Sequence, residues 1–264
     1  MVDTETEHQL ARMTTQALAN RLRSAAPCVA LLPVGSVEPH GPHLPLATDT
    51  LIGEAAAERA VRQLRARGIT ALIAPSVGYG VTDFAAGFAG ALSIPAAALT
   101  SFLRAVVEAH LGAGFAHVCV VNNHLEPEHD AAVRASVAGL PAGKASVASP
   151  LTRRWARTLS AEFKSGACHA GRYETSLILA AAPERVHTEV AQGLPDLGIS
   201  LSKGIQAGQS TFLAMGMDAA YTGAPREASA EEGSDLLERL AEMIATEVTE
   251  GLAELGATPT PVAG

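Results

Sequence analysis

Short apolar runs alternate with longer amphipathic stretches along most of this chain. The continuous apolar runs, each followed by turn or loop residues, predict buried strands at 28–34, 69–74, 117–121 and 145–148. Segments with helical periodicity or rich in alanine predict helices at 51–67, 96–112, 126–140, 173–182 and 230–255. Gly68 and Pro183 stand where two of these helices are expected to stop.

The repeated order of strand, loop and helix predicts an α/β fold, in which helices cover a mainly parallel sheet through right-handed connections. No linker, composition shift or internal repeat divides the chain, so we expect one domain over residues 1–256. The proline-containing tail at 257–264 is expected to be disordered. In sheets of this kind, sites form where loops leave the carboxyl ends of the strands.

Composition narrows the classes of function. The chain of 264 residues carries 27 acidic and 19 basic side chains, and a net charge of -8 argues against nucleic-acid and anionic-membrane partners. Three widely spaced cysteines form neither a disulfide framework nor a CxxC pair, which fits a reduced, cytoplasmic setting. The acidic start is unlike a signal peptide, and no apolar run approaches the ~20 residues that span a bilayer.

Metal-capable side chains are concentrated directly after the first predicted strand. The loop there holds Glu38, His40, His43 and Asp49 among three prolines, which stiffen the backbone and reduce the entropy lost on ordering ligands. Carboxylates and imidazoles are ligand types for a divalent cation. Each residue alone has an ordinary alternative, because Asp49 can cap the next helix and a single histidine is more often packed than ligating. Their concentration in one stiff loop favours a metal site.

A second polar cluster follows the third predicted strand. His124 and Glu126 are two residues apart, so in an extended segment both side chains point the same way and can meet one metal pair. Glu128, His129 and Asp130 fall in the first turns of the next helix, where acidic groups favour the helix dipole. We interpret those three as capping or solvated side chains.

A third cluster precedes the helix expected at 173–182. His169 lies in a loop before alanine and glycine, and its imidazole can carry a proton near neutral pH. Glu174, Thr175 and Ser176 are also typical of a simple helix start, and Cys168 is typical of a small buried hydrophobe. The cluster therefore offers a proton carrier, with a purely structural alternative for its neighbours.

Taken together, these motifs resemble the creatininase (creatinine amidohydrolase) family. The resemblance rests on residues 35–45 with Thr48-Asp49, His124-Leu125-Glu126, His169-Ala170-Gly171 with Glu174-Thr175-Ser176, and residues 223–233. It implies a three-layer α/β/α sandwich with a mainly parallel sheet. It also implies a binuclear metallohydrolase, often hexameric, that cleaves the C–N bonds of cyclic or linear amides. We therefore expect a homo-oligomer with two divalent metal ions per subunit: zinc, manganese or iron.

The resemblance assigns the metal ligands. Glu38 and His124 would hold one metal, His40 and Glu126 the other, and Asp49 would bridge them. Two such cations sharing a water would give hydroxide at neutral pH, which would attack the carbonyl of an amide, lactam or formamide.

The resemblance also implies two catalytic side chains. His169 would give a proton to the leaving amine, a contribution of about 10²–10⁴-fold. Glu174 would orient His169 or support the ligands through a hydrogen bond. We expect His43 to pack behind the site rather than act as a sixth ligand.

Three positions bear on substrate binding. Arg172 stands where many relatives carry glutamate, and it either faces an anionic group of the substrate or forms a structural salt bridge. Leu125 and Cys168 stand where creatininase has an aromatic residue and a carboxylate, which puts creatinine itself in doubt as the substrate. Thr82 follows the second predicted strand and is a candidate to line the pocket, with an ordinary loop position as the alternative.

The leading interpretation is a metal-dependent amidohydrolase acting on a small-molecule amide, which is anionic if Arg172 faces it. One alternative is a peptidase that trims a short peptide, and a wider pocket would separate it from the first. Another is an inactive, metal-stabilised scaffold, which the full ligand set disfavours. A nucleotide-binding protein is disfavoured because neither GxGxxG nor a P-loop follows the first strand.

Overall fold

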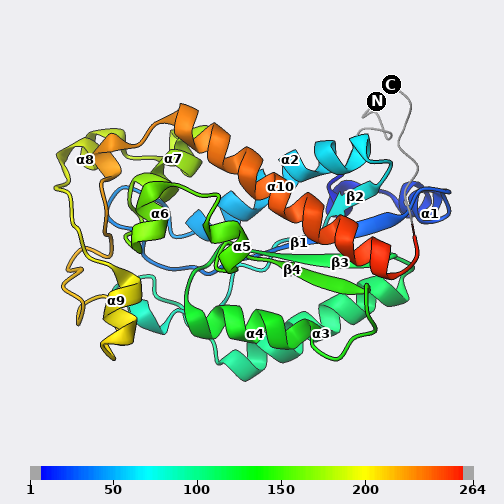
Figure 1. Cartoon of the computed structure of the whole chain (residues 1–264), viewed down its shortest axis with the longest axis horizontal. Coiled ribbons are helices and arrows are strands. Elements are labelled where there is room, and N and C mark those ends of the chain that lie inside the picture. The colour runs from blue at the N-terminus through cyan, green and yellow to red at the C-terminus, as the bar shows by residue number, and fades with distance from the viewer. Residues whose placement is uncertain (1–6, 258–264) are drawn as a thin grey trace.

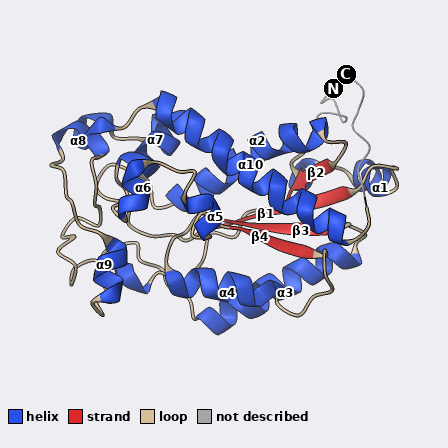
Figure 2. Ribbon diagram, in the orientation of Figure 1, coloured by secondary structure: helices blue, strands red, loops and turns tan. Residues whose placement is uncertain are grey.

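A four-stranded parallel sheet organises the chain, with helices on both of its faces (Figures 1 and 2). The computed structural model describes residues 7–257. The strands β1 (Cys28–Val34), β2 (Thr70–Ile73), β3 (His117–Asn122) and β4 (Ala145–Ala148) lie in the order β2-β1-β3-β4. Every residue of β1 and β3 is buried, as expected for central strands covered on both faces.

The two helical layers enclose separate apolar cores on the two faces of the sheet. One layer holds α2 (Thr48–Ala66), α7 (Arg172–Ala181) and α10 (Ala230–Glu254), and the other holds α3 (Ala96–Gly112) and α4 (Pro127–Val137). α1 (Thr15–Leu22) adds Leu18 and Leu22 to the second core. The predicted three-layer α/β/α sandwich is confirmed. No helix within residues 7–257 has the length and apolar character needed to cross a bilayer.

Most long elements lie where the sequence pattern places them. The strands at 28–34 and 145–148 and the helix at 96–112 have the predicted bounds. α2 begins at Thr48 rather than at 51, so Asp49 belongs to its first turn. α4 ends at Val137, before the predicted end at 140. Apart from Ala257, the tail expected to be disordered lies outside the described residues.

Several short helices have no counterpart among the predicted elements, since they are too short to show a full amphipathic period. They are α5 (Arg153–Ala156), α6 (Ala161–Ser165), α8 (Thr188–Gly193) and α9 (Leu201–Gln206), with 3-10 turns at Leu10–Arg12, Asp83–Ala85, Pro183–Arg185 and Pro225–Glu227. In Figure 1, α5, α6 and α9 lie beyond the ends of the strands, on the side opposite α1. They build the walls around the strand ends.

The strand order creates a switch point between β1 and β3. The chain leaves β1 through α2 toward β2 on one side, whereas it leaves β3 through α4 toward β4 on the other. The loops after the two central strands therefore separate, and they leave a crevice at the carboxyl ends, where ligands bind in open α/β sheets. Two of the three polar clusters follow these same two strands.

Gly35 lets the start of α2 approach the end of β1. A Cβ atom there would lie 2.5 Å from the Asp49 Cβ, which no side chain could tolerate. The Ser36 N–H also donates to Asp49 Oδ2 at 3.1 Å. The glycine and the hydrogen bond bring the Asp49 carboxylate over the end of the central strand.

Candidate metal centre

Three segments far apart in the sequence deliver ligand-type side chains to the crevice at the switch point. The loop after β1 carries Glu38 and His40, and the first turn of α2 adds Asp49. The loop after β3 carries His124 and Glu126, and the segment that starts α7 carries His169 and Glu174. All seven of these side chains are buried.

One group of ligand atoms surrounds His40. Its Nε2 lies 3.1 Å from Asp49 Oδ1 and 3.6 Å from Glu174 Oε2. The Nε2 atom is buried and has no hydrogen-bond partner, while Nδ1 donates to the Glu38 carbonyl at 3.1 Å. The imidazole thus turns an unused nitrogen toward carboxylate oxygens, which is how a metal ligand is oriented.

A second group surrounds His124. Its Nδ1 lies 3.2 Å from Glu38 Oε1 and 3.0 Å from Asp49 Oδ2, and Glu126 completes the set. Asp49 therefore faces both histidines, one with each carboxylate oxygen. In these groups Glu126 lies with His124, and Glu174 lies with His40. A third group joins Glu38 and His40 with His169.

The charge at this place fits a pair of divalent cations. Four buried carboxylates, those of Glu38, Asp49, Glu126 and Glu174, are close to imidazoles, and no lysine or arginine pairs with them within residues 7–257. Buried charge is tolerated only when it is paired or bound to metal. Carboxylate and imidazole donors suit zinc, manganese or iron, so the residues present fit the expected cofactor.

Without metal, the close packing of carboxylates and imidazoles shifts the pKa values of these groups. Burial alone would lower the pKa of His40, but the Asp49 and Glu174 charges outweigh it and raise this pKa to about 10. Burial alone would raise the pKa of Glu38, but the His124 charge outweighs it and lowers this pKa to about 2. Burial dominates for Glu126 and Glu174 and raises their pKa values to about 7 and about 8. Protons therefore occupy places that cations would take.

The loop after β2 holds the ligands in position. The Thr82 hydroxyl donates to Glu38 Oε2, and the backbone N–H groups of Asp83 and Phe84 donate to the two oxygens of Glu126 at 3.0 and 3.2 Å. Thr82 was a candidate pocket residue from the sequence. In the structure, this buried residue contacts a candidate ligand instead of lining the cavity.

His129 supports His124 from behind. The His124 Nε2–H donates to the Val81 carbonyl at 2.7 Å, and the Val81 N–H donates to His129 Nδ1 at 3.3 Å. The two rings also meet edge to face at 4.6 Å, and Gly80 has no side chain because a Cβ would collide with the His129 ring. The interpretation of His129 as a capping or solvated residue is wrong, since its side chain is fully buried.

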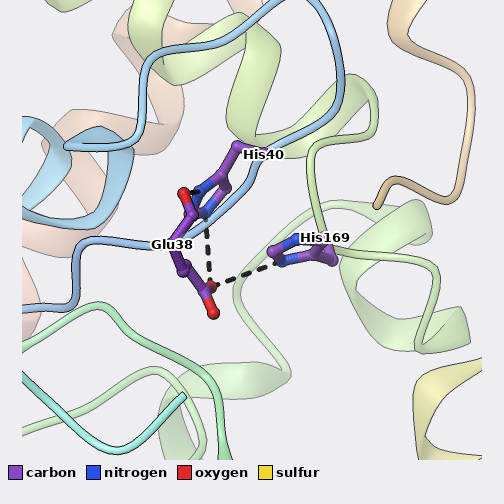
Figure 3. Close-up of side chains that lie close together, drawn as sticks. All are labelled: Glu38, His40 and His169. Atoms are coloured by element: carbon purple, nitrogen blue, oxygen red, sulfur yellow. Dashed lines mark hydrogen bonds and ion pairs between the residues drawn. The ribbon is translucent and has the colours of Figure 1, made fainter. Parts of the chain in front are cut away.

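His169 turns one nitrogen toward the Glu38 carboxylate (Figure 3). Its Nε2–H donates to the Pro39 carbonyl at 2.9 Å, so the neutral ring presents Nδ1, 3.7 Å from Glu38 Oε1. The ring packs between His40 and Phe212, with centroid distances of 4.5 and 4.4 Å. Burial, together with the His40 charge, lowers the pKa of His169 to about 4. Without metal the ring is therefore neutral at pH 7, and Nδ1 carries a lone pair.

Of the two roles expected for Glu174, its contacts fit support of the ligands better than orientation of the His169 ring. Its Oε2 accepts the Ala170 N–H at 2.6 Å and faces His40. His43 is buried, and its Nε2 forms a hydrogen bond with Thr175 Oγ1 at 2.8 Å. It belongs to none of the ligand groups. Its position agrees with packing behind the site.

Arg172 lies in a salt bridge on the protein surface. Its Nε donates to Glu232 Oε2 at 2.5 Å and its Nη1 lies 3.4 Å from Glu227 Oε2. The side chain is 42% exposed and does not line the cavity beside the carboxylates. Of the two roles considered for Arg172, the salt bridge is the one its contacts support.

A cavity of about 570 Å³ opens from the carboxylates. Its inner end is formed by the ligand-type side chains and His169, and its walls are largely apolar, with Leu125, Phe163 and Phe212 among them. Leu125 thus lies where a substrate-binding residue was expected. Phe212 and the residues of α5, α6 and α9 were not anticipated, because they come from short segments without a clear hydrophobic period.

The comparisons with known proteins agree with this geometry. The family model described as creatinine amidohydrolase matches residues 11–248. A mycofactocin precursor peptide peptidase of Mycolicibacterium smegmatis is 36% identical over 177 residues, which are 65% of this chain and only 64% of the relative. The Mycobacterium ulcerans protein of the same name is 32% identical over 242 residues, 84% of this chain and 88% of the relative.

Solved structures share the fold. A crystal structure of creatinine amidohydrolase aligns with a TM-score of 0.71 at 22% identity, covering 93% of this chain and 98% of the other. A zinc–zinc form of a creatininase mutant aligns with a TM-score of 0.69 at 21% identity, covering 92% and 98%.

Proposed function

The chain belongs to the creatininase family, and we propose that this hydrolase is metal-dependent and cleaves the C–N bond of an amide in a short peptide. One observation carries the proposal: ligand-type side chains form three overlapping buried groups at the inner end of a substrate-sized cavity, and Asp49 faces both His40 and His124 there. Such an arrangement of carboxylates and imidazoles is suited to binding cations.

The donor atoms divide between two places. Glu38, His124 and Glu126 would hold one cation, while His40 and Glu174 would hold the other, and Asp49 offers one oxygen to each. Divalent cations held there would supply a nucleophilic water at neutral pH and polarise the scissile carbonyl. This division follows the distances, and it adds Glu174 to the five ligands expected from the sequence.

Proton transfer is assigned to His169. Its Nδ1 faces the inner end of the cavity while Nε2–H is fixed by the Pro39 carbonyl. A neutral Nδ1 can accept a proton from the attacking water and then give the same proton to the nitrogen of the leaving amine. Packing between His40 and Phe212 restricts the ring to this orientation.

A peptide is favoured over a smaller amide by two observations. The relatives that are 32–36% identical are named as peptidases of a peptide precursor, although the M. smegmatis match spans less than two thirds of that protein. The cavity volume of about 570 Å³ lies within the range of sites that enclose ligands with several functional groups. The solved creatininases, at 22% identity or less, support the fold and leave the substrate open.

Metal-dependent hydrolysis of defined substrates tests the proposal. Protein stripped with a chelator and reloaded with zinc or manganese is assayed on short peptides and on creatinine, a lactam and a formamide. We expect peptide cleavage that disappears on stripping and returns on reloading. Asp218→Asn, an exposed carboxylate outside the site, serves as a control that keeps activity. If folded, metal-loaded protein cleaves only the small amides, the substrate is a small amide rather than a peptide. If it cleaves none of these substrates, the proposed hydrolase activity is refuted.

Assembly and location stay predictions. A homo-oligomer is expected from the family resemblance, and light scattering of the metal-loaded protein measures it directly. A cytoplasmic location is expected from the cysteine usage.

A further inference from the structure

The outer part of the cavity carries three positive side chains without carboxylate partners. Arg153 and Arg157 come from α5 and the residue that ends it, and Lys164 comes from α6. Arg153 and Arg157 are four positions apart, which places them on one helical face. Within residues 7–257, none of the three forms an ion pair or a side-chain hydrogen bond, although acidic residues outnumber basic ones in the chain, 27 to 19.

Arg154, on the same helix, is an arginine with ordinary surface contacts. Arg154 donates through both terminal nitrogens to Glu250 at 2.8 Å and lies over the Trp155 ring at 4.5 Å. It points away from the cavity and is satisfied by α10. Arg153 and Arg157 are exposed as well, but unlike Arg154 they line the cavity.

The two ends of the cavity therefore differ in charge, with apolar walls between them. The inner end offers carboxylates and the places for cations, and the outer end offers three free positive charges. The apolar lining includes Phe84, Leu125, Leu151, Phe163, Ile205 and Phe212. The three clustered positive charges at the outer end attract a group of negative charge.

We propose that Arg153, Arg157 and Lys164 bind a carboxylate of the substrate, separated from the scissile amide by an apolar stretch. The inference rests on the proposed function, since it names the class of substrate for the same site. A carboxylate is the ligand that arginine binds with paired hydrogen bonds, and a peptide can supply one from its C-terminus or from an acidic side chain. The apolar walls receive the part between the carboxylate and the bond that is cleaved.

Binding to matched peptides tests the inference independently of hydrolysis. The probes are three N-acetylated apolar pentapeptides: one with a free C-terminal carboxylate, one with a C-terminal amide, and one amidated with glutamate as its last residue. Dissociation constants are measured with metal-loaded protein, and cleavage of the same peptides is followed separately. Wild-type protein is expected to bind at least one carboxylate peptide about 10-fold tighter than the neutral peptide, because hydrogen bonds to charged groups are stronger than neutral ones but are weakened by exposure. Which of the two binds tighter identifies the source of the carboxylate.

Three variants complete the test. Arg153→Gln/Arg157→Gln/Lys164→Gln is expected to lose most of the 10-fold preference, whereas Arg154→Gln keeps it. Arg153→Lys/Arg157→Lys, which preserves the charge, keeps part of it and guards against a folding defect in the triple variant. Equal binding of all three peptides by the wild type would overturn the inference, as would a preference that survives in the triple variant. Preference without cleavage would support this subsite while refuting the hydrolase, so the two claims fail separately.

Discussion

The two ends of the cavity differ in the sign of their charged side chains and in how far these are buried. At the inner end, four carboxylates are buried without a lysine or arginine in the described chain to neutralise them. At the outer end, Arg153, Arg157 and Lys164 are exposed to water and are hydrated at little energetic cost. Buried charge must be matched locally, whereas exposed charge need not be. The inner end therefore suits cations from outside the chain, whereas the outer end needs no such partner and is proposed to bind a ligand.

The largest effect is expected from the proton carrier at the inner end. His169→Gln should lower kcat by about 10²–10⁴-fold, because Gln cannot accept and return a proton, and should leave KM and metal content nearly unchanged. His110→Gln, which replaces a histidine on α3, serves as the matched control. Since His169 also lies within reach of Glu38 and His40 as a ligand, a parallel loss of metal would assign it to coordination instead.

The stability of metal-free protein should decrease as the pH rises. The pKa of His40 is raised to about 10, so between its unfolded value of 6.5 and pH 10 the folded state holds a proton that the unfolded state lacks. The raised pKa values of Glu126 and Glu174, about 7 and about 8, act in the same direction above pH 4.5. Each such proton lowers the free energy of unfolding by roughly 1.4 kcal/mol for every unit by which the pH rises in that range.

Chemical unfolding of chelator-treated protein at pH 7, 8 and 9 measures this decrease. This range lies above 6.5, so the lowered pKa values of His43, His129 and His169 no longer oppose it. Metal affinity should change in the opposite sense, because the ligands must lose their protons before cations bind. A metal-free protein whose free energy of unfolding is constant or rises over this range would contradict the described electrostatics.

A smaller effect is expected behind the inner end, at His129. His129→Leu removes the acceptor for the Val81 N–H, and Val81 fixes the His124 ring, so metal affinity should fall by about 10–100-fold. His129→Gln can still accept that hydrogen bond and should retain more of the affinity. Equilibrium titration of both variants with zinc decides the matter, and equal losses would point to packing rather than to the hydrogen bond.

The smallest effect is expected at Arg172, which belongs to neither end of the cavity. Arg172→Gln should change the free energy of unfolding by less than about 1 kcal/mol, because its partners are on the surface. The KM for anionic peptides should not change, unlike the effect of replacing Arg153, Arg157 and Lys164 together. A rise in KM for anionic peptides alone would return Arg172 to the substrate site.

The same contrast explains what could be predicted from the sequence. Four candidate metal ligands can be identified from the sequence, because carboxylates and imidazoles cluster directly after the apolar runs that form the two central strands. They are Glu38, His40, His124 and Glu126. The sheet and the long helices are predictable for a related reason, since each has enough residues to display its period. Asp49 was identified as a ligand type, but its place in the first turn of α2 depends on the close approach at Gly35.

The remaining features depend on contacts between distant segments. The Glu126 carboxylate accepts the N–H groups of Asp83 and Phe84, which come from the distant loop after β2. His129 resembled a solvated helix residue because acidic residues flank it, and its burial against Gly80 has no local signal. The outer end of the cavity is built from α5, α6 and α9, which are too short to reveal a face by periodicity.

The metal content of the purified protein tests the central claim most directly. Elemental analysis of protein reloaded and then freed of excess metal should give two divalent ions per chain for the wild type and for Asp218→Asn. Asp49→Asn, which removes the charge facing both His40 and His124, should retain fewer than two and lose activity with them. A wild-type protein that is folded yet holds no metal, or an Asp49→Asn variant that keeps both ions, would contradict the account.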